Sequence, residues 1–102
     1  MAGIKIRAKE KDGITQVKAL ISHPMETGNR KDSTGNVIPG HYIEEVIVKQ
    51  GDKIVLTAQW GPAVSKDPYL AFKFKGAFKG DMLTLHWVDN KGESDSLDAE
   101  IK

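Results

Sequence analysis

The stretch IVLTAQWGP, residues 54–62, decides the fold class of this chain of 102 residues. Its apolar side chains recur at every second position, and a period of two is typical of a β-strand with one buried face. Gly61 and Pro62 then end the strand, because proline cannot donate a hydrogen bond to a sheet. The row predicted to face the core consists of Ile54, Leu56, Ala58 and Trp60.

The same alternation recurs along the chain, and short glycine-containing turns separate one run from the next. Such turns, at intervals of roughly ten residues between about seven strands, are typical of a β-sandwich. We therefore predict an all-β, immunoglobulin-like or fibronectin-like sandwich of antiparallel strands, forming a single domain over residues 1–102. A small barrel is the alternative that the same pattern permits. The predicted strands cover residues 4–9, 14–22, 42–50, 54–60, 70–75, 83–87 and 97–101.

The composition excludes several classes of function. The 15 basic and 14 acidic residues leave a net charge of +1, so nothing in the balance favours binding to nucleic acid or to an anionic membrane. The absence of cysteine excludes disulfides, thiolate metal sites and cysteine nucleophiles. No apolar run approaches the roughly 20 residues that cross a bilayer. The N-terminal residues lack the apolar centre of a secretory signal, which by itself favours the cytoplasm.

The segment Ser22–His41, SHPMETGNRKDSTGNVIPGH, differs from the rest of the chain. It shows little periodicity and contains two of the three histidines and two of the four prolines. A connection of this length without secondary structure is uncommon in a compact domain and is usually functional or disordered. Its centre, residues 34–36, suits a hairpin tip, but the pattern leaves its conformation open.

The histidines raise the alternative of a small metal- or ligand-binding sandwich. Imidazole suits zinc or copper, but the spacing of His23, His41 and His86 matches no compact metal motif. The pair Ser22-His23 suggests a nucleophile, yet nothing resembles a nucleophile elbow. We therefore expect no catalytic residue, no cofactor and no metal, and keep the histidine-based site as the second hypothesis.

Three segments together carry a resemblance to a known family. They are ISHPMETG at residues 21–28 followed by Arg30 and Lys31, then AQWGP at 58–62 continuing into SKDPY at 65–69, and WVDNKG at 87–92. Their order and spacing resemble the SoxZ family of thiosulfate-oxidation proteins, over essentially the whole chain from Ile4 to Ile101. The first two segments are specific, whereas WVDNKG alone is also ordinary hairpin chemistry.

The resemblance implies an immunoglobulin-like sandwich without catalytic activity. It implies a heterodimer with SoxY, which carries the sulfur substrate on a cysteine of its C-terminal tail, and transient contacts with other Sox enzymes. The absence of cysteine in this chain agrees with that division of roles. The resemblance also implies a periplasmic protein exported together with SoxY, which replaces the cytoplasmic expectation.

Two surfaces are predicted for these partners. An apolar contact with SoxY is expected on strand faces opposite the core row and around the proline-containing loop, where aromatic side chains suit an interface. A more polar surface in the segment 23–31 is expected to dock enzymes transiently, although the two assignments could be exchanged. We also expect the isolated chain to form a homo-oligomer through its exposed edge strands. The candidate partner-binding residues are Leu20, His23, Pro24, Met25, Glu26, Arg30, Tyr42, Val46, Trp60, Pro62 and Tyr69.

Overall fold

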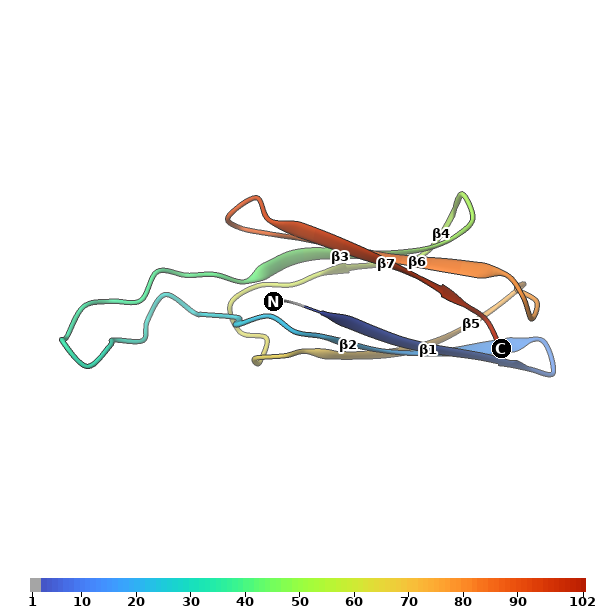
Figure 1. The fold of residues 1–102 in the computed structure, drawn as a ribbon, viewed down its shortest axis with the longest axis horizontal. Helices are drawn as coiled ribbons and strands as arrows, with labels where there is room; N and C mark the ends of the chain where they lie inside the picture. Colours follow the sequence, from blue (N-terminus) through green and yellow to red (C-terminus); the bar gives the residue numbers. More distant parts are fainter. Residues whose placement is uncertain (1–2) are drawn as a thin grey trace.

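The computed structural model describes residues 3–102, in which seven strands form two antiparallel sheets stacked as a sandwich (Figure 1). The predicted all-β sandwich is therefore confirmed, and the separation into two sheets excludes the barrel. Among these residues there is no helix long and apolar enough to span a membrane. One sheet has the order β1-β2-β5, with β1 (Ile4–Lys11), β2 (Ile14–Ile21) and β5 (Tyr69–Lys75). The other has the order β4-β3-β6-β7, with β3 (Ile43–Gln50), β4 (Lys53–Gln59), β6 (Met82–Asp89) and β7 (Ser94–Glu100).

The core lies between the sheets and is built from the inward rows of their central strands. Val17, Ala19 and Ile21 of β2 face Leu83 and Leu85 of β6, and none of these side chains is more than 1% exposed. Burying one such aliphatic side chain contributes about 1.5–3 kcal/mol, so these rows hold the two layers together. The strict alternation of β2 and β6 follows directly from the period of two in the sequence.

Two predicted strand phases are wrong, and a β-bulge explains each. Val55 has no partner between the pairs Val48–Leu56 and Lys49–Ile54, so Ile54 turns outward and is 52% exposed instead of lying in the core row. A second irregularity between Ile43 and Glu45 sets the phase of β3. An extra residue in one strand reverses which face the following side chains occupy.

Val46 is the site residue affected by this phase. It was expected opposite the core row, but it is fully buried and lies opposite Trp87 and Ala58. Because Val46, Ile47 and Val48 are all β-branched, the sequence pattern could not show which of them faces inward. Val46 therefore cannot contact a partner in this structure.

The edges of the sandwich differ. On one side β1 and the end of the chain are joined by two backbone bonds, from Glu10 N to Lys102 O at 2.8 Å and from Lys102 N to Ala8 O at 2.9 Å. On the other side β4 and β5 each pair with a single neighbour. The segment between β2 and β3 projects beyond the sheets (Figure 1), and the molecule extends 54 Å along its longest axis.

Candidate functional site

The segment Ser22–His41, called the arm below, is an irregular hairpin. Its two limbs meet at the isolated bridges Glu26–His41 and Lys31–Val37. Near the base, Glu26 N donates to His41 O at 2.6 Å and His41 N donates to Glu26 O at 3.0 Å. The arm therefore has a defined path, although it has no continuous ladder.

Asp32 organises the tip of the arm. One of its carboxylate oxygens, Oδ1, accepts hydrogen bonds from Thr34 N at 2.9 Å, from Thr34 Oγ1 at 2.7 Å and from Asn36 N at 3.1 Å. The Thr34 side-chain bond, followed by the backbone bonds, lowers the pKa of Asp32 below its usual value. Gly35 adopts φ +87°, a conformation that side chains other than glycine rarely take. The tip is thus a hydrogen-bonded turn, as residues 34–36 suggested.

The base of the arm is held by a cluster of His23, His41 and Asp89, called the clasp below. His23 Nε2 lies 3.0 Å from Asp89 Oδ2, and His41 Nε2 lies 2.7 Å from the same oxygen. The other oxygen, Oδ1, accepts the backbone N–H groups of Lys91 at 3.0 Å and Glu93 at 2.9 Å. A single buried carboxylate therefore joins both limbs of the arm to the β6–β7 turn.

The environment of Asp89 keeps it ionised. Burial by itself raises the pKa of this carboxyl group, because a charge is poorly solvated there. Hydrogen bonds from His23, from Glu93 N, from His41 and from Lys91 N outweigh that cost and lower the pKa from 3.8 to about 2. At neutral pH the clasp thus contains a carboxylate with all of its strong acceptor sites in use.

The donor atoms of the clasp lie within 4.8 Å of one another, a spacing that could hold a metal ion. The hydrogen bonds, however, assign a different role to His23. Its Nδ1 accepts the backbone N–H of Met25 at 3.1 Å, so the ring proton of the neutral form sits on Nε2, where it donates to Asp89. Binding a metal through Nε2 would move that proton to Nδ1, against the Met25 N–H. The arrangement therefore favours a hydrogen-bonded clasp over a metal site.

Aromatic and apolar packing completes the base of the arm. The His23 ring packs edge-on against Trp87, with centroids 5.1 Å apart, and against His41 at 4.6 Å. Met25 adopts φ +50° and is only 5% exposed, with its sulfur 3.4 Å from Ile43 N. A non-glycine residue at positive φ is held there by its surroundings, here by the His23 bond and the core.

The structure brings some of the predicted site residues to one end of the molecule. Leu20 and Tyr69 are directly paired on neighbouring strands, and Pro24, Arg30 and Pro62 are also exposed. Glu26, Tyr42 and Trp60 are partly buried. His23 and Met25 are buried and position the arm, and the small exposed part of Met25 lines a hollow described below. His86 lies on the outward face of β6, opposite Ile47 and Ser96, away from the clasp.

A shallow hollow lies where the arm meets the β4–β5 loop, lined by Pro24, Met25, Glu26, Thr27, Arg30 and Lys66. Arg30 Nη2 donates to Glu26 Oε1 at 2.6 Å, and this bond lowers the pKa of Glu26. The loop is fixed to the arm by Asp67 N, which donates to His23 O at 3.0 Å, and by His23 N, which donates to Asp67 Oδ1 at 3.0 Å. The hollow, the arm and the loop therefore form one continuous surface, called the arm end below.

Sequence reasoning missed three residues that matter to the surfaces. Asp89 carries the clasp, and Glu93 places its Oε1 2.9 Å from His41 Nε2. The signal for Asp89 was present, because it continues the inward row of β6 and a charge in a core row needs partners. Phe78 is the third, at 73% the most exposed large hydrophobic side chain among the described residues, and no strand pattern marked it.

Comparison with protein families decides which family this fold and arm represent. The model of the family described as sulphur oxidation protein SoxZ matches residues 4–100. The chain belongs to the SoxZ family. The match confirms the resemblance carried by the arm, the β4–β5 loop and the β6–β7 turn, and makes the protein a subunit of the Sox sulfur-oxidation system. The search of curated proteins found no match.

Solved structures share the fold at low sequence identity. A hypothetical protein from Pyrococcus horikoshii OT3 aligns with a TM-score of 0.62 and 15% identity, covering 97% of this chain and 87% of that one. A superoxide reductase (neelaredoxin) from Ignicoccus hospitalis gives 0.60 and 19%, covering 100% and 78%. The reduced superoxide reductase (neelaredoxin) from Archaeoglobus fulgidus gives 0.58 and 19%, covering 97% and 86%. At these identities the likeness shows the fold alone.

Proposed function

We propose that this SoxZ-family chain is the non-catalytic subunit of a sulfur carrier complex, and that it binds SoxY through its arm end. The observation that carries this proposal is the arm itself. A hairpin of 20 residues is fastened to the fold by a buried carboxylate, while most of its surface points away from the core. A segment so well fixed at its base yet so exposed along its length suits recognition of another protein.

The centre of the SoxY contact is proposed directly beside the arm end, at Tyr69, which begins β5 after the loop, and at Leu20, near the end of β2 before the arm. The two residues are paired across β5 and β2, and they are 60% and 39% exposed. Pro62 and the partly buried Trp60 lie in or before the loop that leads to Tyr69. An aromatic side chain at the centre of an apolar patch is the kind of residue that dominates binding energy at interfaces.

The proposed role of the complex follows from tethering. SoxY holds the sulfur substrate on a cysteine of its tail, and this chain provides a folded body on which other Sox enzymes dock. Docking raises the local concentration of the tail at each enzyme's active site without any new catalytic group. We further propose that the complex acts in the periplasm and that this chain is exported together with SoxY.

The test of the SoxY contact is Tyr69→Ala, with Phe78→Ala as the matched control. Both side chains are exposed aromatics, but Phe78 lies in the β5–β6 loop, whereas Tyr69 begins β5. Loss of an interface anchor typically costs 2 kcal/mol or more, so we expect the Kd of the heterodimer to rise about thirtyfold for Tyr69→Ala. For Phe78→Ala we expect a change of less than about threefold.

If Tyr69→Ala leaves the Kd of the heterodimer unchanged and Phe78→Ala raises it, the SoxY contact lies at the opposite end of the sandwich. Far-ultraviolet circular dichroism of each variant would establish that both chains keep the fold. If the wild-type chain does not bind SoxY at all, the proposed function itself is wrong.

A further inference from the structure

The outward face of the β1-β2-β5 sheet has an unusual distribution of charge. Its three strands present four rows of three side chains, in which the residues of a row are paired across the sheet. Seven of these twelve positions hold Lys or Arg, and none holds Asp or Glu. This face is therefore strongly basic, although the net charge of the chain is only +1. The basic face, as it is called below, consists of Lys5, Arg7, Lys9, Lys11, Lys18, Lys73 and Lys75.

In the described part of the chain, the charges of the basic face have no ion-pair partner. Among residues 3–102 the ion pairs involve Asp89, Glu93, Glu26 and Glu100, and none includes a member of the face. Arg7 and Lys18 lie directly opposite each other on β1 and β2. Like charges at opposing positions destabilise a sheet, so this arrangement opposes folding.

The outward face of the other sheet shows that this is not a general property of the protein. There Glu45 accepts a hydrogen bond from Gln59 at 2.8 Å, and Asp98 accepts one from Thr84 at 2.7 Å. Its paired rows mix acidic residues with Lys49, His86 and apolar side chains. The positive field is thus confined to one side of the sandwich.

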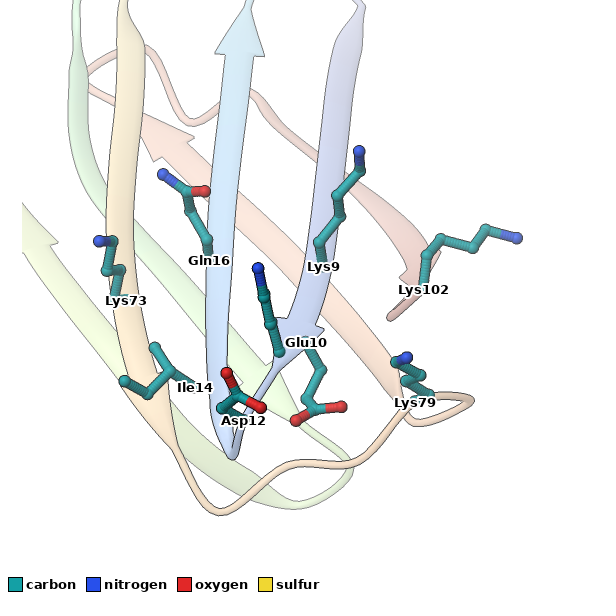
Figure 2. A pocket seen from close by; sticks show the side chains of 9 residues that line it. Lys9, Glu10, Asp12, Ile14, Gln16, Lys73, Lys79 and Lys102 are labelled. Atoms are coloured by element: carbon teal, nitrogen blue, oxygen red, sulfur yellow. The ribbon is translucent and has the colours of Figure 1, made fainter.

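The basic face ends in a hollow at the β1–β2 turn (Figure 2). The hollow is lined by Ile14 and Gln16, by Lys9, Lys11 and Lys73 of the same sheet, and by Lys79 and Lys102. Glu10 and Asp12 also line the hollow, and Glu10 is bound to the turn through the N–H of Gly13 at 2.7 Å. The hollow lies at the far end of β1 and β2 from the arm.

We propose that the basic face docks an acidic surface of another protein, with Asp and Glu carboxylates of the partner set against these rows. The inference rests on the proposed function for the identity of that partner, an enzyme that acts on the sulfur carried by SoxY. Complementary charge speeds the encounter of two proteins more than it prolongs their complex, which suits a carrier that visits several enzymes.

A protein partner fits better than nucleic acid. Six of the seven cations are lysines, whereas the residue best suited to paired recognition of phosphate is arginine. Ile14 and Ala71 interrupt the rows with apolar surface. Burying such surface is favourable against another protein, whose interface combines apolar patches with a polar rim.

The direct test uses poly-L-glutamate as the probe and the purified chain. The variant Lys18→Glu with Lys73→Glu reverses two charges of the basic face, and Lys49→Glu with Lys53→Glu makes the same net change on the other sheet. We expect the face variant to weaken binding at least about tenfold and the control less than about twofold, with wild-type binding falling as salt screens the charges. Equal weakening by the two variants would overturn the proposal, as would tighter binding of duplex DNA or of phosphatidylglycerol vesicles at the same ionic strength.

A second measurement separates this inference from the proposed function. The heterodimer of SoxY with the face variant is offered to each purified Sox enzyme, and KM for the carrier is compared with that of the control heterodimer. We expect KM to rise at least about fivefold at low salt for one enzyme or more, because docking is steered by charge. A heterodimer that forms normally with unchanged KM for every enzyme would refute the docking face and leave the SoxY contact intact.

Discussion

The base of the arm and the basic face use charge in opposite ways. In the clasp, one carboxylate that is 2% exposed receives four hydrogen bonds, two from imidazoles and two from backbone amides. On the basic face, seven cations lie in solvent without an acidic partner among the described residues, and two of them oppose each other directly. The first arrangement stabilises the fold, whereas the second opposes folding.

This contrast gives a way to separate charges that serve the fold from charges that serve a function. Burying a charge is costly unless the charged group is fully hydrogen-bonded. The stability of the fold is therefore enough to explain the residues of the clasp. An exposed cluster of one sign has no such explanation. The proposed docking partner would supply the opposite charge and so offset the cost of this cluster to the sheet.

The largest effect is expected from removing the carboxylate of the clasp. Asp89→Ala leaves the N–H groups of Lys91 and Glu93 and the Nε2 of His23 without their acceptor, and breaking a buried ionic cluster typically costs about 3 kcal/mol or more. Urea denaturation measures this loss. Asp98→Ala, which removes one exposed bond to Thr84, should stay within about 0.5 kcal/mol of the wild type. Similar losses in both variants would mean that the clasp is not specially stabilising.

Acid should weaken the clasp in a defined window of pH. The pKa of Asp89 is about 2 in the folded chain and 3.8 as its ordinary value, so folding is favoured by the ionised form. This contribution, about 2 kcal/mol, is fully present above pH 4 and is lost as the pH falls towards 2. The difference in unfolding free energy between wild type and Asp89→Asn should therefore shrink over that range. If this free-energy difference stays constant down to pH 2, the ionisation of Asp89 does not contribute to stability in this range of pH.

The smallest effect, and one of opposite sign, is expected on the basic face. Lys18→Glu places a carboxylate opposite Arg7, which turns a repulsive cross-strand pair into an attractive one. Thermal unfolding at low salt should show a gain of about 0.5 kcal/mol, the size typical of such pairs. Lys53→Glu, whose paired neighbour on β3 is Gln50, should change little. Destabilisation by Lys18→Glu would show that the face serves the fold after all.

The sequence predicted the parts of this molecule that depend on local pattern. Strict alternation located β2 and β6, and Thr34-Gly35-Asn36 marked the tip of the arm. The phases of Ile54 and Val46 were missed because each depends on a bulge that a period of two cannot show. The clasp and the basic face were missed because they depend on pairing. Asp89 lies 48 residues after His41, and the lysines become one surface only when the register of three strands is known.

Hydrogen exchange of the free chain and of its complex with SoxY tests most directly whether the arm end is the partner surface. The amides of the arm are suited to this readout because few of them belong to a sheet ladder. We expect exchange in the arm and the β4–β5 loop to slow at least about tenfold on binding SoxY, since buried amides exchange through rarer openings. Exchange at the β1–β2 turn, beside the basic hollow, should not change. Unchanged exchange in the arm, with protection at the β1–β2 turn or around Phe78, would contradict the account.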